Sequence, residues 1–499
     1  MAKNEKIDLT ILLLVSLLLS LYLFFRTYVI SLDGAFQFIP MARRFADGSF
    51  KEAIAYGGQQ PLYSFFIAIL SKWVPDFELA GKWVSTFFGL VLIFPVYFLG
   101  KRIFDQKTAF LSAFFLVLYP YLRRFSADVL KESAYLFFFA TAIWFSWRTI
   151  EGQKRYPYLL IPLFSVVAYM VRPDGIEVLL VVFFYLLFIK RFAPPQKRWP
   201  LVILLILSTS ILFAPYLLFL KESAGEWALG KTKTFRMILA GGMMGDDIPF
   251  LQRVLYSLKE VSLKIIGTYH PLYLFLLILG LWKRGISKFK DGEKFLISLA
   301  GAHTLALFLL VLNFTRWGED ESLAESQFSG RHVLPLLIVS IFWVGEGFSR
   351  VSSWISEKVE SLRLLSRLDK DRRSIFVISI SLVLVLGLVL PKTLKPQRHE
   401  RLAEKWAGIW IKDRSGEGLT IFTTMPRVAY YAGGNYEYVP LGKTGIDEIK
   451  GRMEEKKADY LVIREEAASF LSPETQGMVE VKRLAGKGVE TIIIYQKIR

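Results

Sequence analysis

The feature that most constrains this chain is a series of apolar blocks, up to 22 residues long, separated by shorter charged segments. A helix needs about 20 apolar residues to cross the ~30 Å hydrocarbon core of a bilayer. Hydrophobic residues make up 53% of the 499 residues and charged residues only 21%, which excludes soluble, fibrous and disordered classes. The sequence therefore predicts an α-helical polytopic membrane protein.

Eleven blocks are candidate transmembrane helices: 9–30, 81–100, 108–121, 133–147, 157–171, 175–189, 200–219, 271–282, 295–313, 333–348 and 374–391. The first block follows a basic N-terminus, but no small-residue cleavage site comes after it, so we interpret it as an uncleaved helix. Two further apolar stretches, 61–75 and 251–268, contain more polar residues. We predict that these two lie along the membrane interface.

Basic residues gather in alternate loops. With the N-terminus in the cytoplasm, the inner segments 1–8, 101–107, 148–155, 190–198, 283–294 and 349–373 contain 24 Lys and Arg residues against 10 Asp and Glu residues. This asymmetry is the positive-inside signal, and it accounts for most of the net charge of +18. Nucleic acid is therefore not an expected partner. The prediction is a multi-pass protein of the cell membrane.

An odd number of membrane helices places the end of the chain outside the cell. Residues 397–499 are no longer apolar and contain 17 basic and 15 acidic residues, with alternating helix and strand patterns. We predict a transmembrane domain at 1–396 and a small extracytoplasmic α/β domain at 397–499. The second domain has no phosphate-binding glycine motif, and both acceptor selection and a scaffold role stay open for it.

Ionisable residues are scarce within the apolar blocks and gather where the blocks meet the outer surface. The set is Asp33, Arg123, Arg124, Asp128, Lys131, Glu132, Arg172, Asp174, Glu177, Arg331 and His332. A transporter usually places such groups near the membrane midplane. Ordinary interface residues and helix caps are the plain alternative, but the mixed charges favour a site at the outer lipid–water boundary. Arginines there could bind a lipid phosphate, and a carboxylate could act as a general base.

Spacing groups some of these residues. Asp128, Lys131 and Glu132 are spaced to share one face at the start of a helix. The first outer loop, 31–80, contains an amphipathic segment with Arg43 and then GGQQPLY, where glycines and proline break the chain. Such a segment lying on the bilayer could cover a groove for a lipid substrate.

Metal chemistry has little support in the sequence. The chain has no cysteine, so disulfides and Cys-ligated metals are excluded. His270 could meet a carboxylate at the outer surface, but no partner follows at a metal-binding spacing such as HExxH. His303, in the middle of a block, is predicted to be a hydrogen-bonded packing residue.

The layout resembles the C-type polytopic glycosyltransferases, and in particular family 39, which includes protein O-mannosyltransferases and aminoarabinose transferases. The residues that carry the resemblance are LDGAFQFIPMARRFADG and QQPLYSFFIAIL in the first loop, then RRFSADVLKESAYLFFFATAIWF, YMVRPDGIEVLL and SGRHVLPLL. It covers roughly residues 9–391 and implies the C-type glycosyltransferase fold.

The resemblance also implies a reaction. The family transfers a sugar from a polyprenyl-phosphate donor to an extracytoplasmic acceptor, normally with inversion, and the acceptor is a lipid, a glycan or a protein. Its key acid lies just after the first membrane helix, where this chain has Asp33. In many members a second acidic residue directly follows this acid, but in this chain the next residue is Gly34. No cofactor is therefore expected, and a divalent metal is the less favoured alternative.

The expected roles follow from that chemistry. Asp33 and Asp128 are the candidate catalytic residues: Asp33 as the base, and Asp128 to orient the sugar or an arginine. The candidate residues for the donor phosphate and sugar are Arg43, Arg123, Arg124, Glu132, Arg172, Asp174, Arg331 and His332. The alternatives are a transporter or lipid flippase, and a polymerase or ligase that uses a polyprenyl-diphosphate donor.

Overall fold

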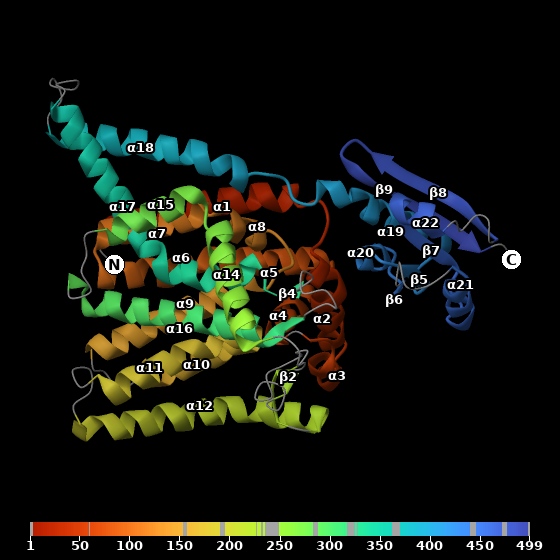
Figure 1. Ribbon diagram of the computed structural model, residues 1–499, viewed down its shortest axis with the longest axis horizontal. Coiled ribbons are helices and arrows are strands. Elements are labelled where there is room, and N and C mark those ends of the chain that lie inside the picture. Colours follow the sequence, from red (N-terminus) through yellow and green to blue (C-terminus); the bar gives the residue numbers. More distant parts are fainter. Residues whose placement is uncertain are drawn as a thin grey trace.

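A bundle of long helices and a small sheet domain make up the protein (Figure 1). The computed structural model describes residues 3–58, 60–152, 157–189, 195–225, 227–230, 233–234, 249–282, 288–316, 325–326, 328–361, 370–439, 446–471 and 477–497. In Figure 1 the bundle helices run horizontally, and the sheet domain lies beyond the end of the bundle where α1 ends.

Helices cover each of the eleven predicted apolar blocks. They are α1 (Lys3–Arg26), α5 (Phe77–Val91) with α6 (Ile93–Ile103), α7 (Gln106–Leu118), α9 (Glu132–Gly152), α10 (Pro157–Val171), α11 (Glu177–Phe188), α12 (Pro195–Ala224), α15 (Pro271–Leu281), α16 (Asp291–Phe314), α17 (Leu334–Ser361) and α18 (Lys370–Thr393). The protein is therefore a multi-pass membrane protein.

The predicted number of eleven crossings is not confirmed. Among the described residues, five helices are long and apolar enough to cross a bilayer, or six if α14 and α15 form one broken span. Part of the difference arises because α7, α10, α11 and α15 are only 13, 15, 12 and 11 residues long, whereas a full crossing needs about 20 residues.

Shorter elements connect the long helices. These are η1 (Gly34–Phe38), α2 (Ile39–Ala46), α3 (Phe50–Ala55), α4 (Leu62–Ser71), α8 (Pro120–Ser126), η2 (Pro173–Ile176), α14 (Phe250–Thr268) and η4 (Gly330–His332), with the small strands β1 (Ala228–Gly230), β2 (Lys233–Thr234), β3 (Thr315–Arg316) and β4 (Glu325–Ser326). Helices α2 and α3 lie at the end of the bundle nearest the sheet domain, which we call the domain-facing end (Figure 1). The two predicted interface segments form α4 and α14, and α14 meets α15 at 104°.

The C-terminal domain is a five-stranded mixed sheet in the order β6-β5-β7-β9-β8. Its elements are η5 (His399–Arg401), α19 (Leu402–Ser415), β5 (Thr420–Thr423), α20 (Pro426–Tyr431), β6 (Asn435–Tyr438), α21 (Ile446–Glu455), β7 (Tyr460–Arg464), α22 (Glu465–Leu471), β8 (Met478–Gly486) and β9 (Val489–Lys497). Successive side chains of a strand point to opposite faces. Val462 therefore packs with α19 and α20 on one face, while Leu461 and Ile463 pack with α21 on the other. The small α/β domain thus has apolar contacts on both faces of its sheet.

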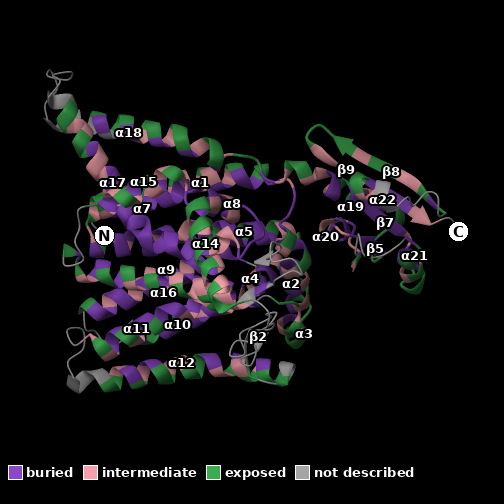
Figure 2. Ribbon diagram, viewed as in Figure 1, coloured by how far each residue is buried: buried purple, intermediate pink, exposed green. Residues whose placement is uncertain are grey.

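The bundle is most buried at its centre. Figure 2 shows buried residues concentrated in α7 and α9, whereas α12 and α18 at the margins carry many exposed residues. Within this centre α15 and α17 cross closely at two glycines. A Cβ at Gly280 would clash with the carbonyl of Trp343, and a Cβ at Gly347 would clash with the carbonyl of Leu276. Small residues allow such backbone approach between membrane helices.

Replacing Gly347 with alanine is therefore expected to destabilise the bundle, because α15 and α17 would be forced apart at a cost of about 1–3 kcal/mol. The matched control is Gly387→Ala in α18, where an added Cβ meets no atom within 4 Å. Thermal unfolding in detergent should show a lower melting temperature for Gly347→Ala only. Equal melting temperatures for the two variants would contradict this account of the crossing.

Candidate active site

An ion cluster forms where the ends of α1, α9 and α17 meet. Asp33 follows α1 by seven residues, and its carboxylate pairs with the guanidinium of Arg331 in η4. The same Nη1 of Arg331 lies 3.7 Å from a carboxylate oxygen of Glu132, the first residue of α9. Asp33 and Arg331 are 298 positions apart in the sequence. Two carboxylates therefore share one arginine at the domain-facing end.

A second arginine borders the cluster. Arg172, which is 4% exposed, forms an ion pair in which its Nε lies 2.8 Å from Oδ2 of Asp174, and it donates from Nη1 to the backbone carbonyl of Arg331 at 2.9 Å. Its guanidinium also lies 5.3 Å from the ring centre of Tyr135, at cation–π distance. Burial alone would raise the pKa of Asp174, but the charges of several neighbours, of which Arg172 contributes most, together outweigh burial and hold the pKa below its usual value. Arg172 thus connects η2 to the Arg331 backbone.

His332 and Lys131 complete the set of charged and titratable neighbours. Burial, reinforced by the charge of Arg172, lowers the pKa of His332 to about 3, so its ring is neutral at pH 7. Its Nδ1 accepts from the amide of Ser329 at 3.2 Å. Burial also lowers the pKa of Lys131 to about 8, even though the charge of Glu132 opposes that shift. Lys131 therefore loses its positive charge within a physiological pH range.

A histidine of the long helix α16 contacts this cluster from the interior of the bundle. His303 of α16 lies with Nδ1 2.6 Å from the carboxylate of Glu177 and with Nε2 2.8 Å from the backbone carbonyl of His332. Because a carbonyl oxygen can only accept, Nε2–H donates to it, and Nδ1 forms a hydrogen bond with the carboxyl group of Glu177. His303 therefore fixes α11, α16 and η4 relative to one another. This is the packing role that its mid-span position predicts.

Several buried polar atoms of the cluster make no hydrogen bond among the described residues. Both carboxylate oxygens of Glu132, which is 1% exposed, accept no hydrogen bond there, and neither does Nη2 of Arg172 donate one. Buried polar groups are normally hydrogen-bonded. Glu132 and Arg172 thus offer an acceptor and a donor to a polar ligand beside Asp33.

Six of the predicted site residues come together in this cluster: Asp33, Glu132, Arg172, Asp174, Arg331 and His332. Four others lie elsewhere. Arg43 is exposed on α2, and its guanidinium lies 5.7 Å from the centre of the Phe77 ring. The pKa of Arg124 is lowered by burial and by the charge of Arg398 in the C-terminal domain, and not by residues of the cluster. Their roles in donor binding stay predictions without a contact to the cluster among the described residues.

Arg123 points into the bundle. It is 1% exposed, and its guanidinium donates to the hydroxyls of Ser16 and Ser20 on α1, at 2.5 and 3.1 Å, and to the carbonyl of Gly89 on α5 at 3.2 Å. These bonds join α8 to α1 and α5. This geometry favours a structural role for Arg123 over phosphate binding.

Asp128 is also placed away from the cluster. It is fully buried, accepts from the amides of Ser31 and Val129 at 3.2 and 2.8 Å, and pairs with Arg398. The predicted shared face of Asp128 and Glu132 is wrong, because α9 begins only at Glu132 and residue 128 lies in the preceding turn, where helical spacing does not apply. Asp128 does pair with an arginine, and that arginine is Arg398. Arg398 lies in no recognisable sequence motif, so the sequence did not predict its role.

Gly34 leaves no space for a second acid next to Asp33. A Cβ there would approach the hydroxyl of Ser31 to 2.7 Å and Cγ1 of Ile30 to 2.9 Å. His270, the other residue considered for a metal, caps α15 by accepting from the amide of Leu272 at 3.3 Å. Metal independence stays a prediction.

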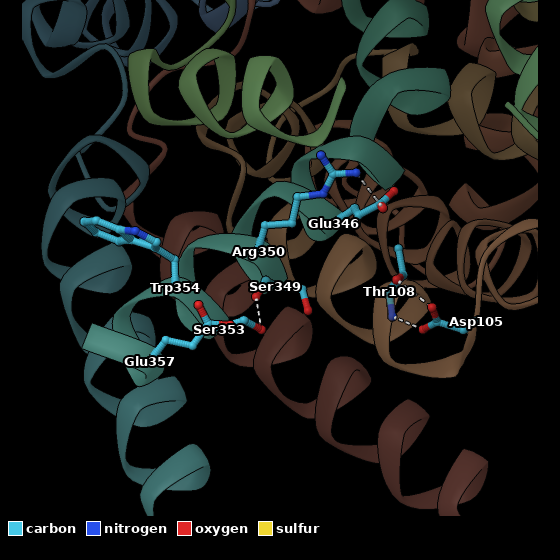
Figure 3. A pocket seen from close by; sticks show the side chains of 8 residues that line it. All are labelled: Asp105, Thr108, Glu346, Ser349, Arg350, Ser353, Trp354 and Glu357. Atoms are coloured by element: carbon cyan, nitrogen blue, oxygen red, sulfur yellow. Dashed lines mark hydrogen bonds and ion pairs between the residues drawn. The ribbon is translucent and has the colours of Figure 1, made fainter. Parts of the chain in front are cut away.

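A polar pocket of about 370 Å³ lies at the opposite end of α17 (Figure 3). There Arg350 pairs with Glu346 at 3.2 Å and donates to the carbonyls of Leu279 and Trp282. Glu346 lies 15 residues after Arg331, which corresponds to about 20 Å along the helix. Arg350 thus joins α15 to α17 and takes no part in the cluster.

Apolar surface of a different kind lies between α4 and α5. Phe66, Leu70, Trp83, Phe87 and Phe88 contribute to the lining of a groove of about 570 Å³. Trp83 and Phe87 are 39% and 57% exposed, as expected of side chains that face lipid. The groove has the chemistry of a site for a hydrocarbon chain.

Comparison with known proteins supports the family resemblance. Residues 58–219 match the family described as dolichyl-phosphate-mannose-protein mannosyltransferase. The match and the helical architecture confirm the resemblance to the C-type, family 39-like glycosyltransferases. No curated protein matches the chain in sequence.

Solved structures share the whole architecture. The oligosaccharyltransferase of Archaeoglobus fulgidus in the apo form is 12% identical, with a TM-score of 0.60 over 93% of this chain and 70% of that chain. ArnT from Cupriavidus metallidurans bound to undecaprenyl phosphate is also 12% identical, with a TM-score of 0.58 over 99% of this chain and 98% of that chain. At these identities the likeness shows the fold, which is the C-type glycosyltransferase fold.

Introducing the second acid as Gly34→Glu is expected to lower the melting temperature, because the new side chain would collide with Ser31 and Ile30. The control is Ala46→Glu, at an exposed position at the end of α2. Thermal unfolding with and without Mn²⁺ tests both points. A Gly34→Glu protein that is as stable as the control, or that Mn²⁺ stabilises, would contradict the steric argument.

Proposed function

We propose that this protein is an integral-membrane glycosyltransferase that moves a sugar from a polyprenyl-phosphate donor to an extracytoplasmic acceptor. The observation that carries the proposal is the cluster in which Arg331 pairs with Asp33 and lies 3.7 Å from Glu132. It combines a carboxylate that can take a proton with cations that can bind a phosphate, at the end of a membrane bundle.

The proposed reaction is an inverting single displacement. The acceptor hydroxyl attacks the anomeric carbon, its proton passes to the carboxylate of Asp33, and the bond from the anomeric carbon to the phosphate oxygen breaks. The transition state resembles an oxocarbenium ion. Asp33 is 19% exposed in its side chain, so an acceptor can reach it.

Positive charge, rather than a general acid, assists the leaving group. The polyprenyl phosphate leaves as a stable anion, and fixed cations stabilise the charge that develops on it. Arg331, Arg172 and Lys131 supply that charge around the cluster. The unpaired Nη2 of Arg172 is suited to donate to a phosphate oxygen.

Donor binding would also change the contacts of the base. In the free protein the guanidinium of Arg331 is paired with the carboxylate of Asp33. A bound phosphate would compete for that guanidinium. The carboxylate of Asp33 would then be free to face the acceptor hydroxyl.

The lipid part of the donor has a suitable place in the apolar groove between α4 and α5. Two related folds support this donor class: ArnT was solved with undecaprenyl phosphate, and archaeal AglB with an inhibitory peptide and a dolichol-phosphate. AglB is 12% identical, with a TM-score of 0.58 over 93% of this chain and 70% of that chain. Both lipids are polyprenyl monophosphates.

The distribution of basic residues indicates how the chain is oriented in the membrane. Glu5, in the first turn of α1, pairs with Lys101 of the basic segment 101–107, and the C-terminal domain lies at the other end of the bundle (Figure 1). We therefore assign the N-terminus to the cytoplasm and the cluster to the extracytoplasmic side.

Asp33→Asn is expected to lower kcat by about 10² to 10⁴, because the amide cannot accept the acceptor's proton. The measurement is transfer from a panel of labelled polyprenyl-monophosphate sugars to total membrane lipid by purified protein. Asp47→Asn, at an exposed position in the same loop, is the matched control. Transfer that survives Asp33→Asn would disprove the assignment of the base.

The same assay separates the other functions. Transfer only from diphosphate donors would indicate a polymerase or ligase. Flux of a labelled lipid in proteoliposomes, without any glycosyl product, would indicate a transporter or flippase.

The lowered pKa of Lys131 predicts an upper pH limit for use of the donor. Because its pKa lies at about 8, it carries positive charge below that pH and loses it above, so kcat/KM for the donor should fall as pH rises through about 8. Lys131→Arg keeps the charge and should move this fall to higher pH. Lys72→Arg, at an exposed position of the first outer loop, is the control. An unchanged pH profile in Lys131→Arg would rule out Lys131 as the titrating group.

A further inference from the structure

The segment that precedes Asp33 is buried but has no regular secondary structure. Residues 27–31 connect α1 to the turn that carries Asp33, and Val29 and Ile30 are fully buried. Buried backbone amides and carbonyls need hydrogen-bond partners. This segment forms no helix or extended ladder that could supply them, so its partners must come from elsewhere.

The first 35 residues of the C-terminal domain supply them. The amide of Tyr28 donates to the carbonyl of Gln397 at 3.3 Å, and the carbonyl of Tyr28 accepts from Lys405 at 3.4 Å. The amide of Ile30 donates to the hydroxyl of Tyr431 at 2.9 Å, and its carbonyl accepts from Arg427 at 2.8 Å.

Arg398 makes the remaining connection. It donates from Nη1 to the carbonyl of Val29 at 3.0 Å and from Nη2 to the buried carboxylate of Asp128. Asp128 in turn accepts from the amide of Ser31 at 3.2 Å. The backbone of Arg398 has φ of 55° and ψ of 33°, a left-handed conformation that is uncommon outside glycine and is often found where the surroundings fix a functional geometry.

The connection continues to the candidate base. The hydroxyl of Ser31 donates to the carbonyl of Val129 at 2.7 Å and accepts from the amide of Gly34 at 2.9 Å. Asp33 lies between these two bonded residues, so its backbone position depends on where the segment 28–31 is held.

We propose that the C-terminal domain positions the base: Arg398, Arg427 and Tyr431 hold the backbone of residues 28–31 so that Asp33 meets the reacting atoms. This inference rests on the proposed function for its effect on catalysis. These three are positioning residues, since their bonds end on the backbone before Asp33 and on Asp128. A displacement of about 1 Å at a reacting group can reduce a rate by about 10².

The test uses the full chain with single substitutions. Arg398→Gln removes the links to Val29 and Asp128, and Tyr431→Phe removes only the hydroxyl that binds the amide of Ile30. The matched control is Tyr430→Phe, a neighbouring half-buried tyrosine whose hydroxyl makes no bond to the segment among the described residues. We expect kcat to fall about tenfold or more in Arg398→Gln and less in Tyr431→Phe, with the KM for the donor unchanged.

A second measurement does not need activity. The chain has no cysteine, so Leu32→Cys accepts a single nitroxide label, and Leu32 is 47% exposed. We expect the electron paramagnetic resonance spectrum of this label to show faster motion in Arg398→Gln and in Tyr431→Phe than in the parent or in Tyr430→Phe.

Each outcome decides the proposal. Faster label motion together with a lower kcat supports it. A folded Arg398→Gln protein with an unchanged label spectrum overturns it, whether or not kcat falls. If Arg398→Gln does not fold, the comparison of Tyr431→Phe with Tyr430→Phe decides in the same way. If the parent protein transfers no sugar from any donor, the proposed function fails, while the label spectra still test the positioning.

Discussion

The ion pair between Asp33 and Arg331 is the interaction on which the candidate site depends. It joins the first outer loop to the start of α17, and it holds two carboxylates and one guanidinium at the edge of a bundle that is otherwise poor in charge. A buried charge is tolerated only when it is paired. The helices that end here are therefore constrained by charge as well as by packing, and His303 fixes the same corner from inside the membrane.

Much of the membrane domain could be predicted because its signal is local. Apolar blocks and alternating basic loops depend on residues close in sequence, and every predicted block is covered by a helix. The convergence of Asp33, Glu132, Arg172 and Arg331 was also predictable, because all four end their blocks on one side. The number of membrane crossings was not, in part because α7, α10, α11 and α15 are shorter than a crossing requires.

The direction of individual side chains could not be predicted from the same pattern. Arg123 and Glu132 are separated by few residues, yet Arg123 points to serines of α1 while Glu132 faces Arg331. The turn at 127–131 breaks the helical period between them. The role of Arg398 could not be predicted for another reason: its partner Asp128 lies 270 positions away, and Arg398 itself belongs to no motif.

The dependence of the segment 28–31 on residues 397–431 sets an order on biosynthesis. At about 5–20 residues per second, the ribosome reaches Arg398 about 20 to 70 s after Ile30. The ten apolar blocks after the first are synthesised in that interval, while the backbone before Asp33 still lacks its partners. Assembly of the candidate site therefore comes last, after the C-terminal domain has been made and has folded. A truncated chain, however well inserted, would lack the contacts that complete the site.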